Sequence, residues 1–262
     1  MHKRCQEEKE MWMTDILEIK NLSFAYGNFR ESSRSKVLDH LNICVGRKES
    51  IGLVGENGAG KSTLLKILTG LLDMQEGAVR IEGLELKKEN LKKIRAELGY
   101  VFQDSDSQLF MPTVYEDVAF APRNYGKSGE ETNRLVLSAL KQVHMEEKKD
   151  RQIYRLSGGE KKLSAIASVL AVGAKLMLLD EPSAALDPKN RRNLIRILNG
   201  LPGAKIIASH DLDFVYDTCQ RVILLSGGRI AADGDAKTLL TDRELLERNG
   251  LELPLSFSRG QR

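Results

Sequence analysis

The sequence lacks the long apolar run that a membrane-spanning helix requires. A span needs about 20 consecutive apolar residues, and no stretch of this 262-residue chain approaches that length. The first 13 residues, MHKRCQEEKEMWM, are charged throughout and contain no apolar segment, so they do not look like a signal peptide. We expect a cytoplasmic protein with a disordered extension over residues 1–14 and ordered sequence from residue 15.

Cysteine and excess charge are also scarce. The three cysteines lie far apart and in no metal-ligand spacing, so the sequence predicts no cysteine metal site. The 40 Lys and Arg residues outnumber the 37 Asp and Glu residues by only three. This balance favours neither nucleic acid nor an anionic membrane surface as a partner, and we expect no nucleic-acid binding.

Short apolar runs that alternate with helical patterns predict an α/β fold. Three such runs are ESIGLVG (residues 49–55), KLMLLDEP (residues 175–182) and AKIIASHD (residues 204–211). Runs of this kind are typical of parallel strands buried on both faces. The leucines and isoleucine of residues 62–72 recur at three- and four-residue spacing, which predicts a helix directly after the first run.

A largely helical stretch separates the first and second of these runs. Residues 128–143 predict an amphipathic helix whose start is marked by Ser128 and Glu131, a pair with the spacing of a capping box. We expect an inserted helical subdomain over about residues 104–165, within a main domain of residues 15–235. Residues 236–262 then form a helical tail.

The stretch GENGAGKST, residues 55–63, predicts a phosphate site. Its spacing fits G-x-x-x-x-G-K-[ST], between a predicted strand and a predicted helix. Glycines let backbone N–H groups converge on β-phosphate oxygens at a helix N-terminus. Lys61 is expected to bridge the β- and γ-phosphates and Ser62 to bind Mg²⁺. The candidate ligands are Gly55, Glu56, Asn57, Gly58, Ala59, Gly60, Lys61, Ser62 and Thr63.

Two acids and a histidine follow the other apolar runs. Asp180 ends its strand where a carboxylate would lie beside Mg²⁺. If the strand geometry persists, Glu181 points the other way and serves to orient or deprotonate an attacking water. His210 ends the next strand, and ligands collect at the carboxyl ends of parallel strands. It is either a surface residue or a contact to the γ-phosphate.

The stretch LSGGE, residues 156–160, narrows the predicted function from NTPases in general to one particular class. A serine and two glycines at the start of a helical pattern form a second anion-binding helix N-terminus, which suggests a site completed by another subunit. This stretch closely resembles the signature motif of ATP-binding-cassette (ABC) ATPases. The resemblance implies a P-loop NTPase (RecA-like) core with an antiparallel β subdomain and an inserted helical subdomain. It also implies that two subunits sandwich each ATP between one phosphate loop and the partner's Ser157, Gly158 and Gly159.

The resemblance extends continuously from about residue 16 to residue 234 and implies further roles. Tyr26 matches the aromatic residue that stacks on adenine, and Gln103 matches the glutamine that joins Mg²⁺ and the attacking water. Asp187, in SAALD, matches the loop that crosses the dimer seam. Glu181 matches the general base and His210 the switch histidine. Together with Lys61 they imply catalysis of ATP hydrolysis to ADP and phosphate, with Ser62, Gln103 and Asp180 as the Mg²⁺ ligands.

A narrower resemblance surrounds the glutamine. Residues 101–126, VFQDSDSQLFMPTVYEDVAFAPRNYG, are similar to the ATPases of energy-coupling-factor (ECF) and cobalt or nickel importers, as is the tail over residues 239–254. The resemblance implies import of metal ions or vitamins, at the cytoplasmic face of a membrane. It also implies a transmembrane partner that contacts residues 104–120.

Two positions depart from the family pattern. Glu160 stands where glutamine is usual, and Leu163 stands where arginine is common. Neither is expected to touch phosphate, so we expect hydrolysis to survive. Both positions instead concern how the two subunits pair where they meet. The second subunit is either identical or a paralogue.

Two other readings remain open from the residues. An ABC ATPase that acts on nucleic acid or ribosomes would carry a long coiled coil or a second cassette, and this chain shows neither. A small-molecule kinase would share the phosphate loop but leaves LSGGE and SAALD without a role.

Overall fold

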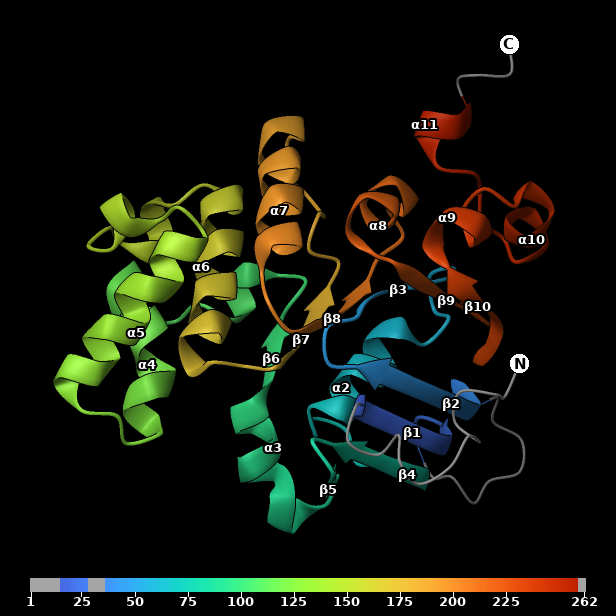
Figure 1. Cartoon of the computed structure of the whole chain (residues 1–262), viewed down its shortest axis with the longest axis horizontal. Coiled ribbons are helices and arrows are strands. Elements are labelled where there is room, and N and C mark those ends of the chain that lie inside the picture. Colours follow the sequence, from blue (N-terminus) through green and yellow to red (C-terminus); the bar gives the residue numbers. More distant parts are fainter. Residues whose placement is uncertain (1–14, 28–35, 259–262) are drawn as a thin grey trace.

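The computed structural model describes residues 15–27 and 36–258, and the described part contains two β-sheets (Figure 1). The expected extension over residues 1–14 lies outside the described residues. The larger sheet has the strand order β10-β9-β3-β8-β7-β6. Its strands are β3 (Ser50–Val54), β6 (Leu98–Val101), β7 (Leu176–Asp180), β8 (Ala204–Ala208), β9 (Arg221–Ser226) and β10 (Arg229–Asp235).

Strands β6, β7, β8, β3 and β9 run parallel to one another, and β10 pairs antiparallel with β9. Strand β7 shows why its sequence is continuously apolar. Leu176 and Leu178 join the core on one face of the sheet, whereas Met177 and Leu179 join the core on the other. Because both faces are covered, every side chain of the strand is buried. The predicted α/β core is confirmed.

The smaller sheet is antiparallel, with the strand order β2-β1-β4-β5. Its strands are β1 (Asp15–Phe24), β2 (Leu38–Gly46), β4 (Glu76–Ile81) and β5 (Leu84–Glu85). It shares one hydrophobic core with helix α2 (Lys61–Leu68) and one face of the larger sheet. This sheet is the antiparallel β part that the family resemblance implied.

Helices fill the chain between β6 and β7, as expected. They are α4 (Val114–Asn124), α5 (Gly129–Gln142) and α6 (Gly158–Val172), which gather at the left of Figure 1, away from α2. The expected capping box of α5 is only half formed. Ser128 Oγ accepts from the Glu131 amide at 3.2 Å, but the Glu131 carboxylate accepts from Lys127 Nζ at 2.8 Å. The neighbouring charge draws the carboxylate away from the backbone.

The remaining helices cover the larger sheet and its β10 edge (Figure 1). Helices α7 and α8 lie on the face opposite the smaller sheet, α9 and α10 lie near β9 and β10, and α11 contacts α8 through Asp213. The bounds are α3 (Leu91–Glu97), α7 (Pro188–Gly200), α8 (Leu212–Thr218), α9 (Ala236–Leu239), α10 (Arg243–Arg248) and α11 (Leu255–Ser258). Short 3₁₀ helices span Lys88–Asn90, Ser105–Ser107, Glu146–Lys148 and Ile153–Arg155. In the described ranges no helix has the length and apolarity that crossing a membrane requires.

Candidate functional site

The loop over residues 55–60 joins β3 to α2, in the strand–loop–helix order that the sequence predicted. Gly55 has a φ of +151°, and a Cβ there would lie 2.3 Å from the carbonyl oxygen of Leu225. Gly60 caps α2 in the left-handed region, with a φ of +99°. Glycine is therefore required at both ends of the loop. Between them, Glu56, Asn57 and Gly58 are exposed, while Ala59 is buried.

Lys61 lies beneath this loop and is 7% exposed. Its Nζ donates to the carbonyl oxygens of Gly55 at 2.7 Å and Glu56 at 3.1 Å. Burial lowers the pKa of Lys61, although the nearby Glu181 and Asp180 carboxylates oppose that shift. The ammonium thus stands between the loop and both acids, where it can meet a phosphate held by the loop.

Asp180, the last residue of β7, forms side-chain hydrogen bonds with α2 and with the neighbouring strand β6. Its Oδ1 accepts from Ser62 Oγ at 2.9 Å, and its Oδ2 accepts from Tyr100 Oη at 3.1 Å. Burial, and then the Asp180 charge, raise the pKa of Tyr100. The sequence pattern predicts no role for Tyr100. Its only signal is a polar hydroxyl near the end of the apolar strand β6, which pairs with β7.

The oxygens of Ser62 and Asp180 suit a magnesium ion whose remaining ligands come from phosphate and water. Mg²⁺ is usually held by one or two protein oxygens, with phosphate oxygens and waters completing its shell. Within the part of the chain that the structure describes, no group of three or more His, Cys, Asp or Glu residues is placed to hold a metal by itself.

Glu181 departs from the strand alternation that its position predicts. Strand β7 ends at Asp180, and Glu181 has a φ of +45°, in the left-handed region. The expectation that Glu181 points away from Asp180 required the strand geometry to persist, and that condition is not met because the strand stops between the two acids. Both carboxylates lie near enough to Lys61 to raise its pKa.

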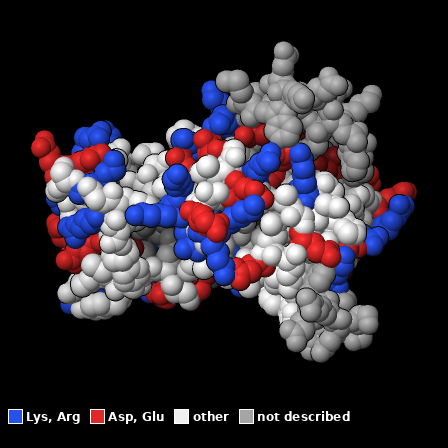
Figure 2. Space-filling model, turned by 90° about the horizontal axis from the view of Figure 1, so that it is seen from below, with Lys and Arg blue, Asp and Glu red and all other residues white. Residues whose placement is uncertain are grey.

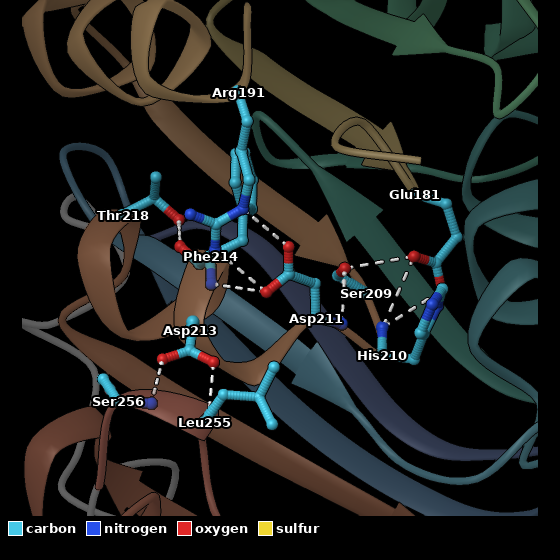
Figure 3. Close-up of polar contacts among 10 residues, drawn as sticks. All are labelled: Glu181, Arg191, Ser209, His210, Asp211, Asp213, Phe214, Thr218, Leu255 and Ser256. Carbon is cyan, nitrogen blue, oxygen red and sulfur yellow. Dashed lines mark hydrogen bonds and ion pairs between the residues drawn. The ribbon is translucent and has the colours of Figure 1, made fainter. Parts of the chain in front are cut away.

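The residues after β8 hold the Glu181 carboxylate (Figure 3). Ser209 Oγ donates to Oε2 at 3.0 Å, and the His210 amide donates to Oε1 at 3.1 Å. The His210 ring also approaches, with Nδ1 at 2.9 Å from Oε1. Ser209 was missed from the sequence, although it directly precedes His210. The structure thus brings Glu181 and His210 together beside Asp180 and Lys61.

Gln103 is exposed just beyond β6. Its backbone is held by α6, the helix that begins in the LSGGE stretch. Lys162, on α6, donates from Nζ to the carbonyl oxygens of Phe102 at 2.9 Å and Gln103 at 2.7 Å. Lys162 is only 3% exposed, and burial lowers its pKa to about 8. The sequence pattern predicts no role for this lysine.

Tyr26 lies beside the start of α2, next to the phosphate loop. Its hydroxyl is 3.1 Å from Thr63 Oγ1, at the start of α2, and its ring contacts Phe24 edge to face. The side chain is half-exposed. The position beside α2 agrees with a contact to a nucleotide base, which stays a prediction.

Ser157, Gly158 and Gly159 begin helix α6. Ser157 and Glu160 form a full capping box, with the Ser157 amide donating to Glu160 Oε2 at 2.8 Å. Glu160 also pairs with Lys148. Burial raises the pKa of Glu160, but these hydrogen bonds prevail and hold it below its usual value. Glutamine could form the same capping box, so what glutamate adds at this position is the ion pair with Lys148. Leu163, the other departure, packs in the core on the α6 side.

Of the two glycines after Ser157, Gly159 lies against the start of α7, whereas Gly158 faces open space. A Cβ at Gly159 would stand 2.7 Å from Cγ of Asn190. Asp187 caps α7 and accepts from the Lys189 and Asn190 amides at 2.9 and 3.0 Å. Within residues 15–27 and 36–258, no hydrogen bond joins residues 157–160 to the loop over residues 55–60. The helix N-termini at Gly60 and Ser157 are therefore separate within one chain, and the anion binding expected at each stays a prediction.

Comparisons with known proteins show the family of this chain. The model of the ABC transporter family matches residues 38–184. The chain is 42% identical over 246 residues to the energy-coupling factor transporter ATP-binding protein EcfA of Carboxydothermus hydrogenoformans, covering 93% of this chain and 89% of that protein.

Solved structures show the same architecture. CbiO1 of Clostridium perfringens, described as part of the ABC transporter complex CbiONQ, superposes with a TM-score of 0.81 at 32% identity, covering 95% of this chain and 100% of that chain. The ATP-binding cassette MJ0796, solved as a dimer bound to ADP and Pi, superposes with a TM-score of 0.74 at 28% identity, covering 84% of this chain and 98% of that chain. With its phosphate loop, paired acids and signature helix, the chain belongs to the ABC transporter family and is one of its ATPases.

Proposed function

We propose that this ATPase is the energy-coupling subunit of an ECF-type importer of metal ions or vitamins. It dimerises around two ATP molecules, with an identical or paralogous second subunit, and drives a transmembrane partner. The observation that carries the proposal is a pair of exposed aromatic rings on the segment over residues 104–120. The names of EcfA and CbiO1, two proteins similar along nearly the whole chain, support it.

The residues around the loop suit water as the phosphoryl acceptor. Mg²⁺ bound with the nucleotide would neutralise phosphate charge, held by Ser62, Asp180 and Gln103. Lys61 binds the β- and γ-phosphates. Glu181, held by Ser209 and His210, accepts the proton of the attacking water.

The second anion-binding helix N-terminus accounts for the dimer. Ser157, Gly158 and Gly159 begin α6, and Gly159 lies against Asn190 near Asp187. These motifs therefore share one surface, which completes the site of the other subunit. Tyr26 stacks on the adenine of its own site.

The segment over residues 104–120 is the proposed contact with the membrane partner. The Phe110 and Phe120 rings are 64% and 38% exposed, with their centroids 4.7 Å apart. Buried Asp117 fixes this arrangement by accepting from the amides of Phe110 at 3.0 Å and Met111 at 3.2 Å. A hollow of about 320 Å³ adjoins it, with Tyr154 on its rim. Exposed aromatic groups on a rigid loop are typical of protein contacts.

The partner would hold this chain at the cytoplasmic face of the membrane. An action on nucleic acid or ribosomes finds no support in the charge distribution. Figure 2 shows Lys and Arg interspersed with Asp and Glu on the face it presents, rather than one basic field.

Co-expression with the transmembrane proteins encoded beside its gene tests the proposal. The wild type should sediment with membranes and gain ATPase activity there. The double variant F110A/F120A should remain in the supernatant while keeping its ATP affinity. L137A, which changes an exposed leucine of α5 outside the segment, is the control and should behave as wild type.

Two results would overturn parts of the proposal. Membrane binding by F110A/F120A equal to wild type would show that the partner contacts another surface. A wild-type ATPase that binds none of these membrane proteins would contradict the transport role itself.

A further inference from the structure

We propose that Arg191 is a positioning residue, which holds the loop that carries His210 against α7, the helix that Asp187 caps. The inference rests on the proposed function, because that function gives His210 a role at one ATP site and Asp187 a role at the seam with the other subunit. Among residues 15–27 and 36–258, no hydrogen bond or ion pair joins Arg191 to His210 or to the phosphate loop.

The contact is a bidentate ion pair between α7 and the first residue after His210 (Figure 3). Arg191 Nε lies 2.9 Å from Asp211 Oδ2, and Arg191 Nη2 lies 3.0 Å from Asp211 Oδ1. Two parallel bonds fix the guanidinium in plane and orientation, which a single bond does not. The same Asp211 Oδ1 caps α8 by accepting from the Phe214 amide at 2.9 Å.

The surroundings make this pair stiffer than an ordinary surface pair. The two side chains are 25% and 27% exposed, and Arg191 Cζ lies 5.6 Å from the centroid of the buried Phe214 ring. Asp213 and Asp217 add further negative charge around the guanidinium. Partial burial and a cation–π contact both strengthen a charge pair over its value in water.

Asp211 also reaches the loop that precedes α7. Ser183, a buried residue of that loop, lies close to the Asp211 carboxylate. That loop contains two non-glycine residues in the left-handed region, Glu181 at a φ of +45° and Ala185 at +59°. Such conformations persist only where the surroundings over-determine them. Arg191, which follows Ala185 in the sequence, binds Asp211, and Ser183, which precedes it, lies close to the same carboxylate.

The consequence is a mechanical link between two parts of the ATPase. His210 adjoins Asp211 and holds Glu181, whereas Asp187 caps α7, one helical turn before Arg191. When the two subunits close against each other at Asp187, α7 moves. Asp211, bound to Arg191 of α7, then moves with the helix, and so does the adjoining His210. Without Arg191 the two loops move separately, and Glu181 loses its fixed orientation.

The test compares R191Q with a matched control, R221Q. Arg221 makes an equally bidentate pair with Asp233, at 2.6 Å for both bonds, between β9 and β10. The readouts are kcat and the Kd for ATP, together with the ¹³C NMR signal of the His210 ring in the nucleotide-free chain. Selective histidine labelling suits a sequence with four histidines, and H210A assigns the signal.

We expect R191Q to shift and broaden the His210 signal and to lower kcat by about 10-fold or more, with ATP affinity retained. D211N, which keeps an oxygen for the Phe214 amide, should do the same, and the double variant should be no worse than either single one. R221Q should leave the His210 signal and kcat as in wild type.

Unchanged kcat and an unchanged His210 signal in R191Q would overturn the inference. So would equal losses in R191Q and R221Q, which would reduce Arg191 to general stability. If the wild-type chain did not hydrolyse ATP, the proposed function would fail instead, and the His210 signal would still decide whether Arg191 positions that histidine.

Discussion

The Nδ1 atom of His210 lies 2.9 Å from Oε1 of Glu181, and the amide of the same histidine donates to that oxygen at 3.1 Å. Ser209 Oγ holds the second carboxylate oxygen. Glu181 is therefore oriented by the residues that follow β8, and not by the strand that precedes it.

Replacing Glu181 by glutamine should separate ATP binding from hydrolysis. The amide keeps the size of the side chain and one acceptor oxygen, but it cannot take a proton from water. We expect turnover to fall by about 10²- to 10⁴-fold, with ATP binding intact and a closed dimer that persists. Size-exclusion chromatography with ATP, and a phosphate-release assay, measure the two effects. E244Q, an exposed carboxylate of α10, is the control. A monomeric E181Q in saturating ATP would contradict the sandwich arrangement.

Replacing Tyr100 by phenylalanine should raise the Mg²⁺ requirement. The hydroxyl donates to Asp180 Oδ2, and without that bond the carboxylate is less firmly held beside Ser62. Loss of such an outer partner typically weakens metal affinity by about 10-fold or more. Mg²⁺ titrations of hydrolysis and of nucleotide binding should both shift, whereas Y125F, near the end of α4, should leave them unchanged. Identical titrations for Y100F and wild type would show that the hydroxyl plays no part.

Replacing Ser157 by alanine should have two distinct effects. Loss of the N-cap of α6 should destabilise the chain by about 1 kcal/mol. S128A removes the corresponding cap of α5, so it is the matched control for stability. Only S157A should also lose hydrolysis, while the monomer keeps its ATP affinity, because Ser157 serves the site of the other subunit. Equal hydrolysis by both variants would contradict that role.

The Cys219 thiol should resist alkylation in the folded protein. Burial raises the pKa of Cys219 from 9.0 to about 12, so at pH 8 its thiolate fraction is about a thousandfold below that of an ordinary thiol. Because the folded pKa is the higher one, Cys219 favours folding at low pH, and that contribution fades as pH rises from 9.0 toward about 12. Mass spectrometry of the Cys219 peptide after iodoacetamide, between pH 7 and pH 9, should show modification only once the chain is unfolded. Rapid labelling under native conditions would contradict the buried position.

Features confined to a few neighbouring residues were predictable from the sequence. The phosphate loop is recognisable because nine consecutive residues, from Gly55 to Thr63, carry both the glycines and the charged or hydroxyl groups. Strand β7 is recognisable because burial on both faces demands an unbroken apolar run. The cap at Ser128 followed the local pattern only in part, since the neighbouring Lys127 competes for Glu131.

The sequence by itself therefore determined the α/β core, the phosphate loop, Asp180 at the end of its strand, and the signature helix start at Ser157. These features depend on local spacing and on the periodicity of burial. Only the tertiary structure decided which side chains meet. Ser62 and Asp180 are 118 positions apart, and Tyr100 and Asp180 are 80 apart, so strand order and register bring them together. The left-handed turn at Glu181 and the Arg191–Asp211 pair likewise arise from packing between segments that no sequence period connects.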